Sequence, residues 1–340
     1  MTARRSRTLL ALIAATTVLG ALAPAGAGAG DDQDVAAEPS PGCESGTPIG
    51  PGEEKVTTTS GRVERWYHRH VPPAHDGAEP VPVVIDLHGY LEGADIHKAH
   101  SALGAYGDEQ GFVTITPHGT GDPVRWDATV DSADMAFIGD LLDEIEAALC
   151  IDERRVFVTG LSNGAFMTSA IACAYGDRIA AAAPVAGISD IDGCEPDRAV
   201  PVVAFHGTDD GFVSFEGGLG EDAADLPAPD GSGETLEESG AGRTAEEGPS
   251  VPEITAAWAD RNDCKAKPRR EELASDVTLV RYRCPDDADV ELYRVEGGGH
   301  SWPGSEFSRQ IESVTGPTTF SISANQVMWE FFERHPLPAG

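Results

Sequence analysis

The stretch RVFVTGLSNGAFM at residues 155–167 decides the fold of this chain. Residues 156–159 are a short apolar run typical of a buried strand, and a helical segment begins near residue 163. Between them, Gly160 and Gly164 flank Ser162, and the absence of two side chains lets a strand and a helix pass close together. A bare match to this Gly-x-Ser-x-Gly pattern arises easily by chance in a glycine-rich chain. Its place between a strand and a helix predicts that Ser162 is a nucleophile on a tight turn.

Short apolar segments alternate with amphipathic ones along most of the chain. Apolar residues recur at three- and four-residue spacing in the segments where we expect helices, at residues 131–149, 163–175 and 323–335. We expect strands at residues 63–71, 81–87, 113–116, 156–159, 179–185, 201–205 and 290–295. Short buried strands separated by helices predict one α/β domain, a mainly parallel central sheet with helices on both faces.

The first 29 residues have the composition of a signal peptide. Three arginines within the first seven residues precede an apolar run at residues 9–22, and small residues follow at 25–29. The apolar run is shorter than the roughly 20 residues that span a bilayer. We therefore expect residues 1–29 to be removed and the mature protein to be soluble and secreted.

Two segments lack the apolar periodicity of the rest. Residues 30–61 are rich in Gly, Pro, Ser, Thr and acidic residues, and we expect a flexible leader there, with ordered structure beginning near Arg62. Residues 216–250 form an acidic insertion with almost no large apolar side chain. This insertion is either disordered or a flexible flap beside the site.

The charge of the chain excludes some classes of partner. The sequence has 57 acidic residues against 24 lysines and arginines, which gives a formal net charge of −33 at pH 7. This excess opposes binding to nucleic acid and to anionic membrane surfaces. We expect neither as a partner and interpret the acidity as an adaptation to solubility or salt. The oligomeric state is not determined by the sequence.

Six cysteines follow the expected signal peptide. An even number in an exported protein predicts up to three disulfides, and their spacing fits no zinc motif. Six cysteines allow fifteen pairings, so the residues alone leave the connectivity open. The cysteines are Cys43, Cys150, Cys173, Cys194, Cys264 and Cys284.

A nucleophilic serine needs a base, and the base needs an acid that orients it. On a fold of this kind the acid follows the serine in the chain and the histidine follows the acid. His335 ends the last expected helix before Pro336, where we assign it to the surface. His300 instead closes the glycine run 297–299 after an expected strand. The order therefore predicts His300 as the general base.

The candidate acids follow the strand expected at residues 201–205. Residues 206–210 read His-Gly-Thr-Asp-Asp, which places Asp209 and Asp210 at the carboxyl end of a strand, where the sites of α/β proteins are built. Proximity does not choose between the two carboxylates. His206 precedes both acids, and we interpret it as a structural residue.

Two backbone N–H groups are expected to stabilise the oxyanion. One belongs to the residue after the nucleophile, Asn163, and the other to Tyr90, which follows the Asp-Leu-His-Gly segment at residues 86–89. The histidine of that segment, His88, is expected to be structural. Two tryptophans, Trp126 and Trp302, either stack on the substrate or pack in the core.

Two pairs of histidines have spacings that could bind a metal. They are His68 with His70 and His97 with His100. No carboxylate or cysteine pattern in the sequence supports either pair as a site. We therefore expect neither a metal nor a cofactor.

Four motifs in order resemble one family of enzymes. They are DLHGY at 86–90, the segment 155–167, HGTDD at 206–210 and GGGHSWPG at 297–304. Together they resemble the secreted α/β-hydrolase esterases grouped as poly(3-hydroxybutyrate) depolymerases, which are similar to feruloyl and acetylxylan esterases. The resemblance covers roughly residues 60 to 338 and implies that residues 62–338 form an α/β-hydrolase catalytic domain.

The resemblance also implies roles for individual residues. In that family the acid is the last residue of the HGTxD segment, which corresponds to Asp210 and leaves Asp209 as the alternative. The resemblance further implies three disulfides, Cys264 with Cys284, Cys173 with Cys194 and Cys43 with Cys150.

The triad and the resemblance together predict hydrolysis of carboxylic esters through an acyl-enzyme. Ser162 attacks, His300 transfers the proton, Asp210 holds the imidazole, and the N–H groups of Tyr90 and Asn163 bind the oxyanion. The expected substrate is a small or oligomeric ester, either a hydroxyalkanoate oligomer or a short-chain ester, because no module that grips insoluble polymer is apparent. The alternatives are a feruloyl or acetylxylan esterase, a serine peptidase, and a non-catalytic binding protein on the same fold.

Overall fold

The computed structural model describes residues 36–45, 49–191, 193–239, 248–285 and 288–339. The expected signal peptide, residues 1–29, lies outside these ranges. Within them, no helix is long and apolar enough to cross a membrane.

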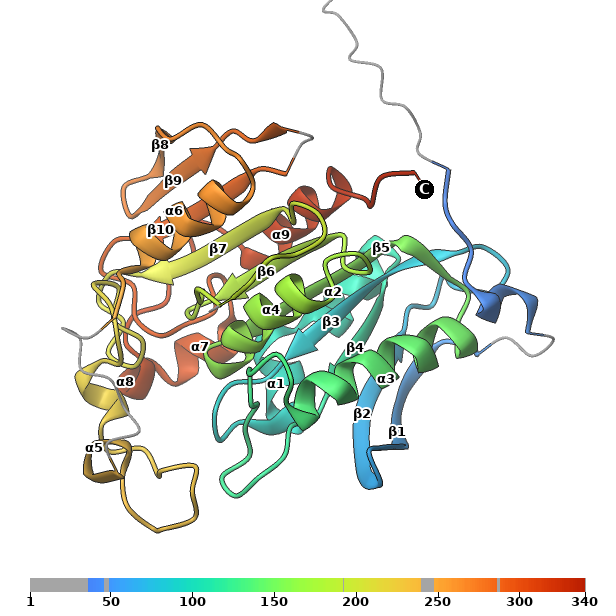
Figure 1. Cartoon of the computed structure of the whole chain (residues 1–340), viewed down its shortest axis with the longest axis horizontal. Helices are drawn as coiled ribbons and strands as arrows, with labels where there is room; N and C mark the ends of the chain where they lie inside the picture. Colours follow the sequence, from blue (N-terminus) through green and yellow to red (C-terminus); the bar gives the residue numbers. More distant parts are fainter. Residues whose placement is uncertain (1–35, 46–48, 192, 240–247, 286–287, 340) are drawn as a thin grey trace, which may run out of the picture. The chain divides into compact units, whose positions relative to one another are not determined.

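A ten-stranded sheet forms the framework, in the order β1-β2-β4-β3-β5-β6-β7-β10-β9-β8 (Figure 1). The six central strands, from β4 to β10 in that order, pair in parallel, and antiparallel strands flank them on both sides. The mainly parallel sheet predicted from the sequence is therefore confirmed. The strands are β1 (Gly52–Ser60), β2 (Val63–Val71), β3 (Val81–Leu87), β4 (Val113–Pro117), β5 (Ile151–Leu161), β6 (Ala181–Val185), β7 (Val202–Gly207), β8 (Arg269–Ala274), β9 (Val277–Tyr282) and β10 (Val290–Val295).

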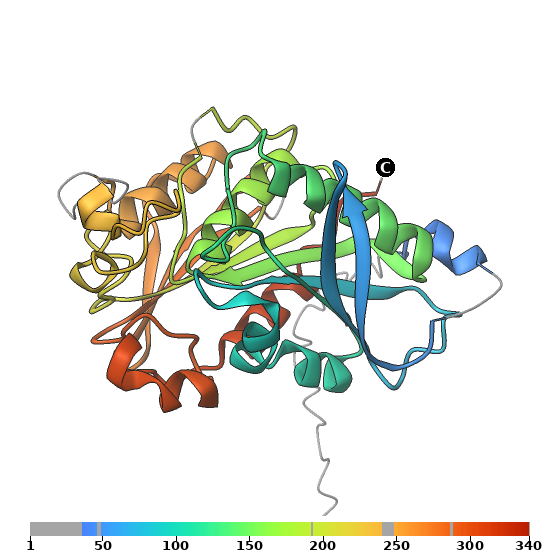
Figure 2. The same ribbon diagram turned by 90° about the horizontal axis from the view of Figure 1, so that it is seen from below.

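Helices cover both faces of this sheet (Figure 2). The larger helices of one face are α3 (Ala133–Ala148), α4 (Asn163–Ala174) and α6 (Val251–Arg261). The other face carries α1 (Gly93–Ser101), α2 (Leu103–Gln110) and α9 (Ala324–Glu333). Shorter helices lie in loops: α5 (Leu236–Ser239), α7 (Glu306–Gln310), α8 (Glu312–Thr315) and the 3-10 helices Pro41–Glu44 and Glu221–Ala223.

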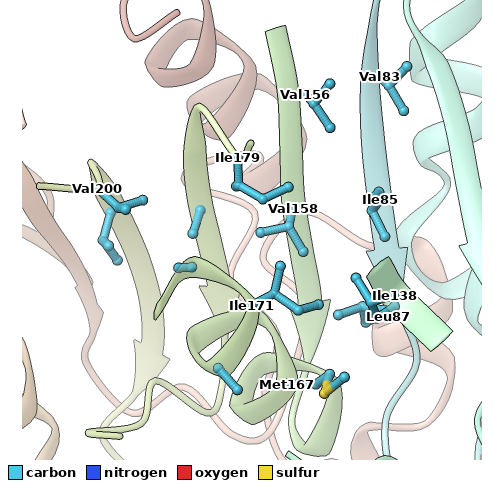
Figure 3. Close-up of a cluster of buried hydrophobic side chains, with 14 of the residues drawn as sticks. Val83, Ile85, Leu87, Ile138, Val156, Val158, Met167, Ile171, Ile179 and Val200 are labelled. Atoms are coloured by element: carbon cyan, nitrogen blue, oxygen red, sulfur yellow. The ribbon is translucent and has the colours of Figure 1, made fainter. Parts of the chain in front are cut away.

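The central strands are apolar on both faces because helices cover both. In β3, Val83 and Ile85 pack toward α3 and α4, whereas Val84 between them packs into the cluster on the opposite face. This alternation follows the two-residue period of a strand. Figure 3 shows the first cluster, in which side chains of β3 and β5 approach Ile138 and Ile171 from α3 and α4. The packing fixes the carboxyl ends of these strands relative to each other.

The expectation that ordered structure begins near Arg62 is wrong. Residues 52–60 of the supposed leader form β1, which pairs antiparallel along its whole length with β2. Most of its side chains are exposed because β1 is the edge strand of the sheet. Val56, the one large apolar side chain of β1, packs against the core, so the apolar alternation used to find strands is absent from this strand. The other edge, the hairpin of β8 and β9, was not expected either, and the side chains of β8 are largely exposed.

Three disulfides join distant parts of the chain in the pairing that the resemblance implied. Cys43–Cys150 ties the 3-10 helix Pro41–Glu44 to the start of β5, across 107 residues of sequence. Cys173–Cys194 and Cys264–Cys284 close much shorter loops, with sequence separations of 21 and 20.

The bridge that closes the longest loop is expected to stabilise the fold most. A cross-link restricts the unfolded chain more when its loop is longer, and loops of these two lengths differ by about 1.5 kcal/mol in that contribution. Replacing both Cys43 and Cys150 with serine should therefore lower the free energy of unfolding by about that much more than replacing Cys264 and Cys284. Urea unfolding of the two double variants, followed by tryptophan fluorescence, measures the difference. An equal or larger loss for the second variant contradicts the prediction.

Candidate active site

Ser162 occupies the turn between β5 and α4 in a strained conformation, with φ 58° and ψ −119°. Its N–H donates to the carbonyl of Val185 on the neighbouring strand, at 2.9 Å. Both flanking positions require glycine, because a side chain at either one would clash with a nearby carbonyl group. A Cβ on Gly160 would lie 2.6 Å from the carbonyl oxygen of Gly164, and one on Gly164 would lie 2.2 Å from that of Leu87. The turn therefore depends on a backbone approach that no other residue type permits.

His300 and Asp210 meet because β7 and β10 are parallel neighbours, so the loops after them leave the same edge of the sheet. His300 Nδ1 lies 2.8 Å from Oδ2 and 3.0 Å from Oδ1 of Asp210. Oδ1 also accepts the N–H groups of Phe212 and Val213, each at 2.9 Å. Asp209 by contrast is exposed. The structure thus brings His300 to Asp210 and not to its neighbour.

His206 is a further partner of the Asp210 carboxylate. Its Nε2 lies 2.9 Å from the carbonyl oxygen of Val213 and 3.3 Å from Asp210 Oδ2. Since both neighbours are acceptors, we assign the proton to Nε2. Burial alone would raise the pKa of Asp210, but the charges and hydrogen bonds of His300 and His206 hold that pKa well below its usual range. The structural role expected for His206 therefore includes a contact with the candidate acid, which its place before Asp210 in the chain did not indicate.

The loop after β3 lies close to the candidate nucleophile, Ser162. A Cβ on Gly89 would lie 3.6 Å from the Cβ of Ser162. His88 is buried, donates from Nδ1 to the carbonyl of Gly89 and accepts at Nε2 from the N–H of Gly119, each at 2.8 Å. Burial lowers the pKa of His88 to about 3, so the neutral ring acts as a fixed link between two loops. Tyr90 follows in the chain and lines the same cavity as Ser162.

A cavity of about 620 Å³ opens at Ser162. Tyr90 and Asn163, the two expected oxyanion residues, line it together with Ser162. Phe212 is also in its wall, and its ring centre lies 5.1 Å from that of His300. The cavity is therefore bordered by the candidate nucleophile, by both residues expected to bind the oxyanion and by a neighbour of the candidate base. Most of its other walls are apolar, with Trp126, Ala128, Phe166, Val213, Leu219, Ala223, Leu226, Pro229 and Leu236 among them.

The acidic insertion supplies one wall of this cavity. Its few apolar side chains, among them Leu219, Leu226 and Leu236, line the cavity, although the stretch is too polar to form a core of its own. Tyr90 also donates its hydroxyl to the carbonyl of Pro227 at 2.7 Å. Of the two expectations for residues 216–250, this position fits a segment beside the site; residues 240–247 lie outside the described ranges.

The two tryptophans proposed to contact substrate differ. Trp302 is not among the described residues that line the cavity: it is 1% exposed, donates from Nε1 to Asn325 at 2.8 Å and packs edge-on against His97. A role for Trp302 in stacking on substrate is therefore wrong, because its ring is enclosed in the core. Trp126 does line the cavity but is only 2% exposed, and its indole Nε1 donates to the carbonyl of His88 at 3.0 Å. Its backbone N–H donates to Asn163 Oδ1 at 2.7 Å. Trp126 orients Asn163 more than it presents a stacking surface.

Glu92 lies beside the histidine pair His97 and His100, a carboxylate that the sequence spacing did not reveal. One ligand atom from each of the three lies within 4.8 Å of the others, which is close enough for a metal site. Within the protein, however, every ring nitrogen of both histidines already has a hydrogen-bond partner. The other pair, His68 and His70, is divided between two different aspartates.

Comparison with known proteins extends these observations. No family model matches the sequence. Feruloyl esterase B of Piromyces equi is 26% identical over 240 residues, which cover 68% of this chain and 41% of that protein. Poly(3-hydroxyalkanoate) depolymerase C of Paucimonas lemoignei is 35% identical over 131 residues, 35% of this chain and 30% of that protein. Both matches span less than half of the relative's length.

A solved structure matches over most of the fold. The acetyl xylan esterase from Aspergillus awamori superposes with a TM-score of 0.52 over 83% of this chain and 99% of that chain, at 15% identity. A likeness at this identity concerns the fold, and it agrees with the parallel sheet covered by helices on both faces. The chain thus has the α/β-hydrolase fold and is a relative of esterases that include feruloyl esterases and a poly(3-hydroxyalkanoate) depolymerase.

Proposed function

We propose that this chain is a secreted serine esterase that hydrolyses carboxylic esters through an acyl-enzyme. The observation that carries the proposal is one of placement: Ser162, on its strained turn, and the buried pair of His300 and Asp210 follow the parallel strands β5, β7 and β10, and so lie at the same carboxyl end of the sheet. The names of the relatives support ester bonds as the target. Three disulfides support an oxidising compartment outside the cell.

The reaction follows from the roles of these groups. Ser162 Oγ attacks the ester carbonyl carbon while His300 takes its proton, and the Asp210 carboxylate keeps the other ring proton on Nδ1. The oxyanion accepts hydrogen bonds from the N–H groups of Tyr90 and of Asn163, the first residue of α4, where N–H groups have no partner within the helix. His300 then protonates the leaving alcohol, and water hydrolyses the acyl-enzyme by the same steps in reverse.

The cavity favours a small or oligomeric ester. Because the acidic insertion forms one of its walls, the cavity holds a ligand of limited size and does not present a flat surface to a solid. Arg125 also lines it, and the described residues place no carboxylate in an ion pair with this guanidinium. An oligomer of hydroxyacids ends in a carboxylate that suits such a group. Hydroxyalkanoate oligomers and short-chain esters are therefore the proposed substrates.

A feruloyl ester is the second candidate. The rings of Phe166 and Phe212 line the cavity and suit an aromatic acyl group, and one relative is named a feruloyl esterase. A panel of feruloyl, acetylated-sugar and aliphatic esters separates the two candidates by kcat/KM.

Loss of either proton-transfer partner is expected to abolish turnover. Ser162→Ala and His300→Ala should each lower kcat for 4-nitrophenyl acetate by about 10³-fold or more, because triad members act as a unit. Circular dichroism and thermal unfolding check that each variant is folded. Near-normal turnover by a folded variant contradicts the esterase proposal. Labelling of Ser162 by a fluorophosphonate, with a peptide substrate assayed beside the ester, tests the binding-protein and peptidase alternatives.

The two neighbouring aspartates should differ sharply. Asp210→Asn replaces the carboxylate that holds the His300 ring and should lower kcat by about 10³-fold or more. Asp209→Asn alters an exposed side chain and should leave kcat within about twofold. Steady-state kinetics of both variants on one ester make the comparison. The reverse ranking would transfer the role of the acid to Asp209.

Recognition of a terminal carboxylate is tested at Arg125. Arg125→Gln should raise KM for a soluble 3-hydroxybutyrate trimer by about tenfold, the loss of one charge-assisted hydrogen bond, and leave KM for its methyl ester unchanged. Arg269→Gln, an exposed substitution on the edge strand β8, is the matched control. An equal effect of Arg125→Gln on both trimers would remove this residue from substrate recognition. Faster attack on suspended polymer than on either trimer would contradict the proposed substrate class.

A further inference from the structure

A buried polar network connects two loops that the proposed mechanism uses. The first, the oxyanion loop, is residues 88–92 after β3; the second, the histidine loop, is residues 296–305 after β10 and carries His300. The network consists of Glu92, His100 and Ser308, from three separate elements or loops. All three side chains are buried or nearly so.

Both ends of this network are main-chain N–H groups. At one end, Glu92 Oε2 accepts the N–H of Gly89 at 2.7 Å, and Gly89 lies so near Ser162 that a Cβ added to it would be 3.6 Å from the Ser162 Cβ. At the other end, Ser308 Oγ accepts the N–H of Trp302 at 3.0 Å, two residues after the candidate base. His100 spans the gap, with Nδ1 2.7 Å from Glu92 Oε1 and Nε2 2.7 Å from Ser308 Oγ. A continuous chain of hydrogen bonds therefore joins the two loops.

Donors and acceptors can be assigned consistently along this series of hydrogen bonds. Ser308 accepts from Trp302, so its own hydroxyl is free to donate to His100 Nε2. The imidazole proton is then on Nδ1, which faces the Glu92 carboxylate. Every donor meets an acceptor, which is the condition under which a buried polar network rigidifies its surroundings.

A second imidazole anchors the network in the sheet. His97 lies between Glu92, at 3.0 Å, and Asp86, at 2.7 Å, the latter near the end of β3. Burial disfavours a charged ring, but the two carboxylates outweigh it and raise the pKa of His97 to about 10. The positive ring in turn helps to hold the pKa of Glu92 well below its usual range, against the effect of burial. Glu92 is therefore an ionised carboxylate, with three donors around its two oxygens, supplied by Gly89, His97 and His100.

We propose that Glu92, His100 and Ser308 are positioning residues that hold the oxyanion loop and the histidine loop at a fixed separation. The inference rests on the proposed esterase function. Burying an ionised group is unfavourable unless it is fully paired, and apolar side chains could fill the same space. What apolar side chains cannot supply is acceptors for the N–H groups of Gly89 and Trp302, which fix one loop beside Ser162 and the other beside His300.

Ser308→Ala interrupts the series of hydrogen bonds between the two loops without removing a charge. Ser40→Ala is the matched control, since Ser40 is equally buried and likewise links an N–H, of Ile151, to a carbonyl, of Leu149, away from the cavity. We expect Ser308→Ala to lower kcat about tenfold with KM within twofold, because small displacements of catalytic groups reduce the rate more than ground-state binding. Ser40→Ala should lower Tm by about as much as Ser308→Ala does, but should leave kcat unchanged.

A second measurement distinguishes positioning from general stability. The affinity for phenylboronic acid, which forms a tetrahedral adduct with a nucleophilic serine, should fall in Ser308→Ala by the same factor as kcat. Glu92→Gln interrupts the same series of hydrogen bonds at its other end and should give a similar loss of kcat and of boronate affinity. The double variant should be no more impaired than the more impaired single variant. If Ser308→Ala does not fold, Glu92→Gln carries the test.

The outcomes separate this inference from the function on which it rests. The inference would be overturned if Ser308→Ala and Ser40→Ala had equal kcat and equal boronate affinity. If Ser162→Ala were inactive in the same assays, the proposed esterase function would still stand. An active Ser162→Ala would instead refute the esterase. Activity that falls on dialysis against a chelator and returns with Zn²⁺ would also overturn the inference, since Glu92, His97 and His100 would then be metal ligands.

Discussion

The contact between the turn at Ser162 and the end of β3 is the constraint on which the rest of the site depends. The turn approaches β3 so closely that a side chain at Gly164 would meet the carbonyl oxygens of Leu87 and His88. The same approach brings the loop after β3 beside the candidate nucleophile, since a Cβ added to Gly89 would lie 3.6 Å from the Ser162 Cβ. One backbone contact therefore fixes the candidate nucleophile relative to the N–H groups proposed to bind the oxyanion. Its strain is sustained by the packing of β3 and β5 beneath α3 and α4.

Around this contact, the groups with proposed catalytic roles are held by buried polar side chains. Asp210 accepts from two backbone N–H groups and contacts two histidines, and Glu92 accepts from one backbone N–H group and two histidines. A buried carboxylate with this many donors is ionised and has one stable position. The two loops proposed to carry the oxyanion donors and the base are thus each tied to such a carboxylate. The chain of hydrogen bonds through His100 joins the loops to each other.

The acidic insertion shows how a segment without a core of its own contributes to the site. In its described part, residues 216–239 and 248–250, the acidic side chains are exposed, and its few leucines lie against the cavity at Ser162. In a chain with a net charge of −33, Arg125 is the only lysine or arginine among the described residues that line this cavity. Substrate selection is therefore proposed to depend on this wall and on Arg125 more than on the triad.

The sequence by itself determined the fold class, most of the central strands and the candidates Ser162, His300 and Asp210. These features depend on local patterns: apolar runs, glycines at a forced approach, and the order of residues along the chain. Tertiary structure alone decided which features lie side by side. It placed β1 at an exposed edge, enclosed Trp302 in the core, brought His206 to Asp210 and set Glu92 beside His97 and His100. Edge strands carry no apolar signature, and side-chain contacts between separate loops have no fixed spacing in sequence, so only the folded chain could show them.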